Sequence, residues 1–193
     1  MSISTATTLR NAYVTRSNAA TKVALVLGGV AFLSLMAQIT VPVPGSPVPV
    51  TGQTLGALLL ATAYGASLGF TTFASYMIIG FLGAPVFASG GHGLARMTGA
   101  TGGYLVGMLI ASLITGFLAG RKWDQKISTV IPTMLIGDAV IFTTGLIWLH
   151  HVAGATWAWT FSKGFTPFIL GEVIKIAIAC TTLPTLWRFV PKQ

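Results

Sequence analysis

Residues 23–40 read VALVLGGVAFLSLMAQIT, and they open a stretch without Lys, Arg, Asp or Glu that continues to Ala95. The chain of 193 residues is 53% hydrophobic and only 7% charged, with a mean hydropathy of +0.81. Soluble domains carry about 25% charged residues, because these residues cover the surface that faces water. A long uncharged stretch needs lipid as its solvent. The sequence therefore predicts an integral membrane protein built from hydrophobic helices.

The lengths of the apolar segments predict six membrane spans in one all-α transmembrane domain, residues 1–193. The block from Val50 to Pro85 would measure roughly 54 Å as a single helix, well beyond a ~30 Å hydrocarbon core. We therefore expect it to turn near residues 65–69. Four prolines within residues 41–50 exclude a helix and favour an extended loop. After a polar segment 1–22, the expected spans are approximately 23–40, 51–64, 67–82, 99–120, 128–150 and 166–187, with a glycine-rich loop over 87–96 and a Trp- and Phe-rich loop before the last span.

The positive charges give an independent prediction of topology. With six spans both termini share one side, and that side holds most of the cations: Arg10, Arg16, Lys22, Arg121, Lys122, Lys126, Arg188 and Lys192. The other side holds Arg96 and Lys163, while Lys175 falls within the last span. This asymmetry predicts that both termini are cytoplasmic. The net charge of +8 is spread over the ends of apolar segments, which is typical of contacts with lipid headgroups and argues against a nucleic-acid partner.

Three charged residues lie inside the expected spans, where a charge is costly and often marks function. Glu172 and Lys175 are three residues apart and share one helical face. They form either a self-neutralising ion pair or a polar binding site with one acceptor and one donor. Asp138 either makes a structural hydrogen bond to a neighbouring helix or belongs to the same site.

Arg96 is the second candidate, since it follows Gly90, Gly91 and Gly93 in a loop that can approach a ligand closely. Its guanidinium suits a carboxylate, although a lipid phosphate is the alternative partner. The small residues Ala20, Ala24 and Gly28 form a stripe on the first span that permits close approach of another helix, from this chain or from a partner.

Signals of catalysis and of cofactors are missing from the sequence. His92, His150 and His151 have no carboxylate or cysteine nearby in the sequence, so we expect no metal site. No nucleophile–base pair and no nucleotide-binding loop appears, so an intramembrane enzyme is disfavoured and the chain is not expected to use ATP itself.

Several motifs together resemble the BioY family, the biotin-specific substrate-binding (S) components of energy-coupling factor (ECF) vitamin transporters. The resemblance runs from the first span to the last. It is carried by residues 41–56 (VPVPGSPVPVTGQTLG), 83–87 (GAPVF), 101–105 (TGGYL) and 171–175 (GEVIK).

The resemblance implies a multi-pass protein of the bacterial inner membrane with a high-affinity biotin site near its outer face. It implies a transmembrane coupling protein (T component) and cytosolic ATPase (A) subunits as partners, with Ala20, Ala24 and Gly28 as the docking surface for the coupling protein. Within the site, Glu172 would accept from the ureido N–H groups, Lys175 would donate to a polar atom of the ligand, and Arg96 would hold the tail carboxylate. Tyr104, Phe87 and the loop prolines would supply apolar walls, and the remaining expected contacts are Gln53, Ser89 and Asp138.

The chain departs from the family pattern at a few positions. Glu172 stands where the family usually has Asp, Ala100 stands where Pro is usual, and Ala88 and Ser89 stand where some members place an amide side chain. An S component for another small carboxylate-bearing vitamin and a structural or channel-like helical bundle remain as alternatives.

Overall fold

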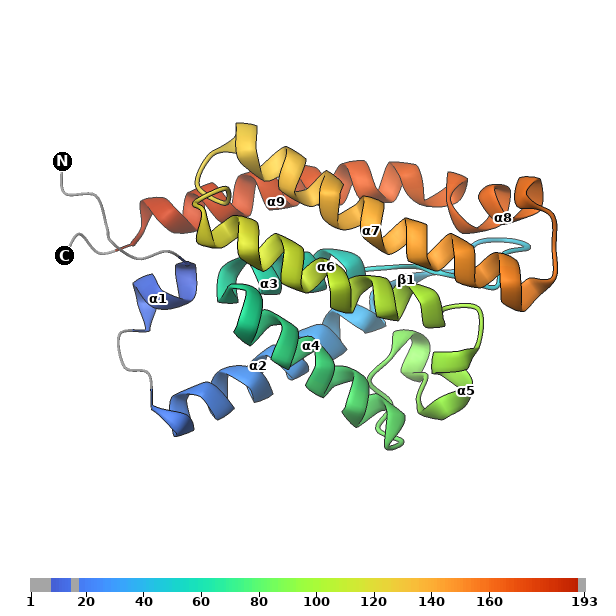
Figure 1. Cartoon of the computed structure of the whole chain (residues 1–193), viewed down its shortest axis with the longest axis horizontal. Helices are drawn as coiled ribbons and strands as arrows, with labels where there is room; N and C mark the ends of the chain where they lie inside the picture. The colour runs from blue at the N-terminus through green and yellow to red at the C-terminus, as the bar shows by residue number, and fades with distance from the viewer. Residues whose placement is uncertain (1–7, 15–17, 191–193) are drawn as a thin grey trace.

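The computed structural model describes residues 8–14 and 18–190 and is built from helices, as predicted (Figure 1). The elements in chain order are α1 (Leu9–Tyr13), α2 (Ala19–Gln38), β1 (Thr40–Val41), β2 (Val50–Thr51), α3 (Gln53–Tyr64), α4 (Ala66–Phe81), η1 (Ala88–Gly90), α5 (Gly93–Thr98), α6 (Gly102–Gly120), α7 (Ile127–Ala153), α8 (Trp157–Gly164), η2 (Thr166–Phe168) and α9 (Ile169–Arg188).

The long apolar block turns at Gly65, within the region where a turn was expected. Gly65 has φ +83°, a backbone conformation that residues other than glycine rarely adopt, and it separates α3 from α4. The two helices then run side by side and both pack on α6. Every residue of α3 from Gln53 to Leu58 is buried, so this helix lies in the centre of the bundle.

Helices α6 and α7 pack closely against each other. A Cβ on Gly103 would collide with Trp148, and a Cβ on Gly107 would collide with Thr144. The absence of side chains at these two positions lets the helix backbones approach each other. The start of α6, which contributes to the site described below, is thereby held firmly against α7.

Four helical stretches of the described residues are long and apolar enough to cross a membrane: Ala19–Gln38, Gly102–Gly120, Ile127–Ala153 and the stretch Trp157–Arg188 that contains α9. Helix α4 is apolar but shorter, and α3 has only 12 residues. The exterior of the bundle is apolar, as Leu35 (70% exposed) and Leu170 (72% exposed) illustrate. A surface of this kind suits lipid rather than water.

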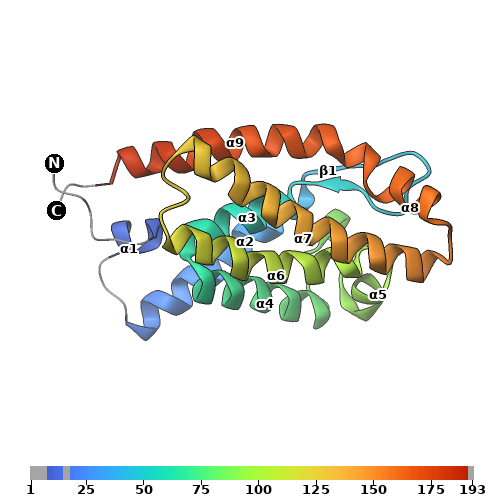
Figure 2. The ribbon, with the colours of Figure 1, turned by 45° about the horizontal axis from the view of Figure 1, so that its top comes forward.

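The proline-rich loop between α2 and α3 is extended, as expected, and its ends pair as a short antiparallel ladder. Thr40 faces Thr51 and Val41 faces Val50. The tip of the loop reaches α8, where Ser46 Oγ donates to the Lys163 carbonyl at 2.8 Å (Figure 2). The loop therefore covers the end of the bundle that lies opposite the termini.

Three helices were missed by the sequence analysis, and one of them is α5, which forms at the end of the expected glycine-rich loop 87–96. Residues 157–164 were predicted to be loop but form α8, whose first turn is capped by the Thr156 hydroxyl. The segment expected to be merely polar contains α1, capped by Thr8. The helix boundaries also shift: α2 begins at Ala19 because the Asn18 side chain accepts from the Thr21 N–H, and α9 begins at Ile169 after the 3-10 turn η2.

The end of the bundle that carries the termini is tied together by two hydrogen bonds. Trp187 Nε1 in α9 donates to Asp124 Oδ2 in the α6–α7 connection at 2.6 Å, and the Tyr13 hydroxyl of α1 donates to the Leu186 carbonyl at 2.7 Å. Arg121, Lys122 and Lys126 lie in the same connection or at its edge. Arg16 and Lys192, which also entered the charge count, lie outside the described residues.

Candidate ligand-binding site

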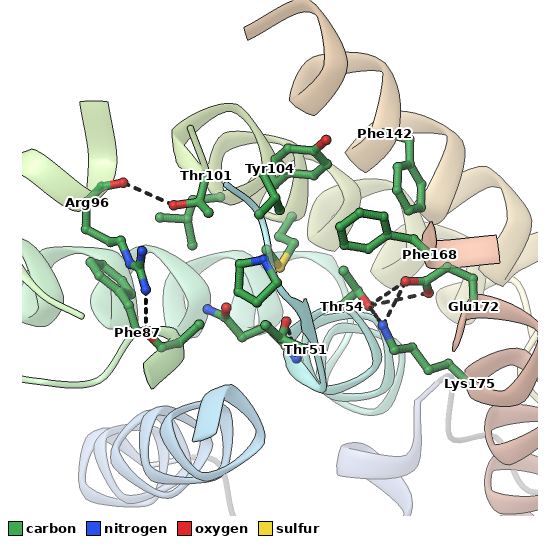
Figure 3. Close-up of a pocket in the computed structure, with 16 residues that line it drawn as sticks. Thr51, Thr54, Phe87, Arg96, Thr101, Tyr104, Phe142, Phe168, Glu172 and Lys175 are labelled. Carbon is green, nitrogen blue, oxygen red and sulfur yellow. Dashed lines mark hydrogen bonds and ion pairs between the residues drawn. The ribbon is translucent and has the colours of Figure 1, made fainter. Parts of the chain in front are cut away.

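A cavity lies between the proline-rich loop, the starts of α3 and α6, the η1–α5 region and the first turns of α9 (Figure 3). It contains about 520 Å³ of empty space, part of which is open to solvent. The lining is mostly apolar or aromatic with a few polar groups: Val48, Pro49, Thr51, Gln53, Thr54, Phe87, Ala88, Arg96, Thr101, Tyr104, Leu105, Met108, Phe142, Phe168, Glu172 and Lys175.

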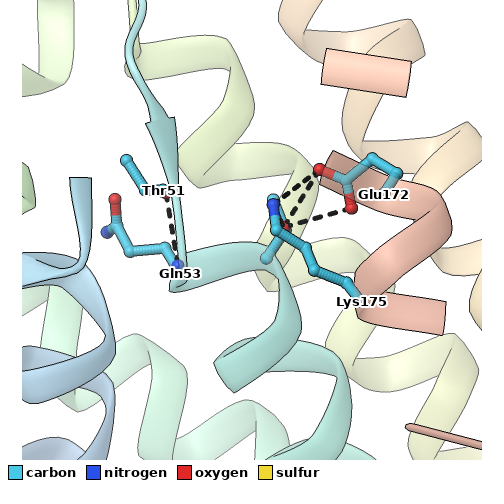
Figure 4. Close-up of polar contacts among 5 residues, drawn as sticks. Thr51, Gln53, Glu172 and Lys175 are labelled. Atoms are coloured by element: carbon cyan, nitrogen blue, oxygen red, sulfur yellow. Dashed lines mark hydrogen bonds and ion pairs between the residues drawn. The ribbon is translucent and has the colours of Figure 1, made fainter. Parts of the chain in front are cut away.

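At one end of the cavity, Glu172 and Lys175 form a nearly buried ion pair. Lys175 Nζ lies 2.7 Å from Glu172 Oε1, and the two side chains are 13% (Lys175) and 10% (Glu172) exposed (Figure 4). Thr54, in the first turn of α3, joins them: its hydroxyl accepts from Lys175 Nζ at 2.8 Å and lies 3.3 and 3.4 Å from the two Glu172 oxygens (Figure 3). The cluster therefore presents both a carboxylate and an ammonium to a ligand.

Arg96 lies toward the other end of the cavity, as Figure 3 shows. One guanidinium nitrogen, Nη2, donates to the Ala88 carbonyl at 2.7 Å, and the Arg96 carbonyl accepts from the Thr101 hydroxyl at 3.2 Å. These bonds fix the arginine between η1 and the start of α6. A guanidinium has five N–H donors, so this arrangement leaves donors for an anionic group.

Gln53 lines the cavity but also belongs to a hydrogen-bond chain. Its Nε2 donates to the Tyr76 hydroxyl at 2.7 Å, and that hydroxyl donates to the Val86 carbonyl at 2.9 Å. The chain connects the start of α3 to the segment before η1. Within the described residues, the Gln53 Oε1 atom makes no hydrogen bond, and it is the atom that the side chain can offer to a ligand.

Aromatic side chains form one wall of the cavity. Tyr104 and Phe168 stack with an interplanar angle of 20° and a centroid separation of 6.4 Å, and Phe142 meets both rings edge-on. The Tyr104 hydroxyl donates to the Gly164 carbonyl at 2.9 Å, so it is occupied by α8 and the ring rather than the hydroxyl faces the cavity. Phe87 is buried at the opposite side against Tyr76.

Two of the predicted contacts do not reach this cavity. Ser89 is exposed in η1 with φ +56°, and its neighbour Ala88 lines the cavity instead. Asp138 lines a separate, smaller cavity together with Glu172, Lys175, Leu58 and other apolar residues, on the inner side of the ion pair. Asp138 is 7% exposed, and its Oδ1 atom is buried without a hydrogen-bond partner among the described residues.

The small residues on α2 face outward. Ala20, Ala24 and Gly28 are all exposed, and a Cβ on Gly28 would meet nothing within 4 Å. In the part of the chain that the structure describes, the stripe is therefore exposed rather than packed. Among residues 8–14 and 18–190, no group of three His, Cys, Asp or Glu side chains is arranged to hold a metal ion.

Thr54 is the main site residue that the sequence analysis missed. It lies within the quoted motif 41–56, but nothing in the sequence shows that its hydroxyl touches a pair more than a hundred residues away. Phe142 and Phe168 were also missed, because aromatic residues are common in membrane helices and do not by themselves mark a site.

Comparison with known proteins connects this fold and cavity to one family. The BioY family model matches residues 6–192. The Lactococcus lactis subsp. cremoris protein "Biotin transporter BioY2" is 34% identical over 154 residues, covering 78% of this chain and 81% of its own. The Pyrococcus horikoshii protein "Probable biotin transporter BioY" is 38% identical over 160 residues, covering 83% of this chain and 92% of its own.

A solved structure has the same fold. It is the S-component for biotin from an ECF-type ABC transporter, which superposes with a TM-score of 0.76 at 21% identity and covers 90% of this chain and 95% of that one. The family model spans nearly the whole sequence, and the relatives match over most of their own length. This chain belongs to the BioY family.

Proposed function

We propose that this chain binds biotin with high affinity and serves as the S component of an ECF-type biotin uptake system. The observation that carries the proposal is the arrangement of charge in the cavity: an ammonium–carboxylate–hydroxyl cluster at one end and a guanidinium toward the other, separated by apolar and aromatic walls (Figure 3). The relatives named as biotin transporters support the choice of ligand.

Biotin has complementary groups at its two ends. Its ureido head carries two N–H donors and one carbonyl acceptor, which suit Glu172 and Lys175 respectively. Its tail carboxylate suits Arg96, and its thioether ring and aliphatic chain suit the walls formed by Tyr104 and Phe168. Gln53 Oε1 offers one further acceptor near the start of α3.

We further propose six membrane spans, α2, α3, α4, α6, α7 and α9, with both termini in the cytoplasm of a bacterial cell. The cations of the α6–α7 connection lie at the same end as the termini, which supports this orientation. Helix α3 is about 18 Å long and too short to cross alone. The extended residues 41–51 complete that crossing, and backbone of this kind is tolerated where it lines a cavity within the protein.

The partners that we propose are a transmembrane coupling protein and cytosolic ATPase subunits, which would supply the energy that this chain has no motif to capture. The exposed stripe of Ala20, Ala24 and Gly28 supports a close helix–helix contact with the coupling protein. Among the described residues, no atom lies within 4 Å of a Cβ placed on Gly28.

Equilibrium binding of labelled biotin to the purified protein tests the proposal. We expect saturable binding at one site per chain in the nanomolar range, competed by unlabelled biotin. Failure to bind at micromolar biotin, by protein that is monodisperse and folded, would overturn the assignment. Preferential competition by a different carboxylate-bearing vitamin would identify an S component of other specificity.

A further inference from the structure

The turn that precedes α5, residues 87–91, is held in place by the last residue of α2. This turn contains η1, and α2 packs against it. The Gln38 side chain makes two hydrogen bonds to the turn: Gln38 Nε2 donates to the Phe87 carbonyl at 3.2 Å, and Gln38 Oε1 accepts from the Gly90 N–H at 3.1 Å. Gln38 itself does not line the biotin cavity.

The backbone of the turn has a conformation that depends on support from its surroundings. Ser89 has φ +56° and Gly90 has φ +69°, both in the left-handed region. A serine is rarely found there unless the surrounding structure fixes it. Within the turn, the Phe87 N–H donates to the Gly91 carbonyl at 3.0 Å. Gln38 adds its two bonds from α2, so the shape of the turn also depends on that helix.

The same turn positions the Arg96 guanidinium. Arg96 Nη2 donates to the Ala88 carbonyl at 2.7 Å, and a Cβ on Gly91 would collide with Arg96 Nε, so the arginine side chain lies across the turn (Figure 3). Ala88 is buried and lines the cavity together with Arg96. A movement of the turn would therefore move the guanidinium within the site. A donor that is already ordered binds a carboxylate more tightly than a donor that must first be ordered.

Gln38 also connects this end of the site to the helix that carries the exposed stripe. Gln38 Nε2 donates to the Ser34 carbonyl at 3.1 Å, one turn earlier in α2, which anchors the amide on its own helix. Ala20, Ala24 and Gly28 lie on the same helix. A shift of α2 would thus be transmitted through Gln38 to the turn and to Arg96.

We propose that Gln38 is a positioning residue for the Arg96 guanidinium and that it acts by holding the turn 87–91 on α2. In this way Gln38 raises the affinity of the site for a ligand carboxylate without touching the ligand. The inference rests on the proposed function, because it takes the biotin carboxylate as the partner of Arg96.

Hydrogen exchange of the free, full-length protein tests whether Gln38 holds the turn. Gln38→Met keeps the length of the side chain and removes both bonds to the turn. We expect amide exchange within residues 87–91 to become faster by about threefold or more, because the Gly90 N–H loses its acceptor. Thr98→Val is the matched control, since Thr98 is also exposed near Arg96 but its hydroxyl donates to the Leu94 carbonyl of its own helix. Unchanged exchange in Gln38→Met, or the same increase in both variants, would overturn the proposal.

Binding of biotin and of biotin methyl ester tests the effect on Arg96. We expect Gln38→Met to weaken binding of biotin by about three- to tenfold and binding of the ester by less than about twofold. In the Arg96→Ala background, the same substitution should have no further effect on biotin affinity, because the guanidinium that Gln38 positions is gone.

The binding outcomes separate positioning of Arg96 from a general structural role. An equal loss for acid and ester, or an undiminished effect in the Arg96→Ala background, would overturn the proposal. Wild-type protein that binds no biotin would overturn the proposed function and this inference with it. Normal binding of biotin by both the wild type and Gln38→Met would overturn this inference alone.

Discussion

Lys175 Nζ lies 2.7 Å from Glu172 Oε1, one turn apart on α9, with both side chains nearly buried in the wall of the proposed biotin cavity. A buried pair of this kind is stable only while both partners are present, because loss of one leaves the other charge uncompensated. In the proposed complex, the same two groups form hydrogen bonds with the ureido head of biotin. The pair is thus both a structural contact of the free protein and the centre of recognition.

We expect Glu172→Gln and Lys175→Met each to weaken biotin binding by more than about tenfold, or about 1.4 kcal/mol, because each loses a charge-assisted hydrogen bond to the ligand. The double variant should lose less than the sum of the two, since it leaves no unpaired charge. Equilibrium binding of labelled biotin measures all three. If both single variants bind biotin as the wild type does while remaining folded, the site assignment is wrong.

Thr54→Val should weaken biotin binding by about three- to tenfold, because it removes the hydroxyl that accepts from Lys175 and fixes the pair against α3. Thr62→Val is the matched control. Thr62 is also buried in α3, but its hydroxyl donates locally to the Leu58 carbonyl and does not line the cavity. Equal effects of the two substitutions would point to helix stability rather than ligand recognition.

Much of the fold could be predicted from length and hydropathy. The break at Gly65 followed from a helix that would have exceeded the bilayer, and the extended loop followed from its prolines. Helix α8 could not be predicted, because its Trp and Phe residues are equally typical of an interfacial loop and only the Thr156 cap and packing on α7 select a helix. Helix α1 is short and depends on contacts with α3 and α9.

The site was predictable only in part. Glu172 and Lys175 could be predicted because a charge inside an apolar span is costly and therefore often marks function. The same reasoning included Asp138, which the structure places on the inner side of the pair, outside the main cavity. Which face of a helix turns toward the cavity depends on packing with other helices, and a single sequence does not contain that information. For this reason Thr54 was missed, and Ser89, predicted as a hydrogen-bond partner of biotin, is exposed in η1 outside the cavity lining.

We expect Arg96→Ala to weaken binding of biotin strongly but binding of biotin methyl ester only slightly, because the ester has no carboxylate for the guanidinium to pair with. Competition of each ligand against labelled biotin gives the two affinities in wild type and variant. The Arg96 side chain also donates to the Ala88 carbonyl, so a general effect on the loop is the alternative. An equal loss for acid and ester would support that alternative.

Asp124 predicts a pH-dependent stability at the end that carries the termini. It is fully buried, its Oδ1 has no hydrogen-bond partner among residues 8–14 and 18–190, and burial raises its pKa from 3.8 to about 6, against the opposing effect of the Trp187 hydrogen bond. The folded state therefore holds the Asp124 proton more tightly than the unfolded state. Ionisation of this carboxyl lowers the stability of the fold: the loss is absent below about pH 4, grows as the pH rises, and is complete above about pH 6.

Asp124→Asn should therefore raise the apparent melting temperature at pH 7.5 and change it little at pH 4, while the amide oxygen still accepts from Trp187. Thermal unfolding of the purified protein in detergent at the two pH values measures this difference. Trp187→Phe is the companion variant, and it should lower the melting temperature at pH 7.5 because it removes the only hydrogen bond that a side chain of the described residues gives the carboxylate. The prediction would be contradicted if Asp124→Asn lowered the melting temperature, relative to wild type, more at pH 7.5 than at pH 4.

The exposed stripe on α2 predicts a separation between binding and assembly. Ala24→Leu and Gly28→Leu should leave biotin affinity unchanged, because both positions are exposed and a Cβ at Gly28 has no atom of the described residues within 4 Å. Both should reduce co-purification with the coupling protein, since bulky residues prevent close approach of a partner helix. Ala139→Leu, at an exposed alanine of α7, is the control for added bulk on the lipid-facing surface. Unchanged complex formation in the two α2 variants would move the docking surface elsewhere, whereas loss in all three would indicate a general effect of bulk.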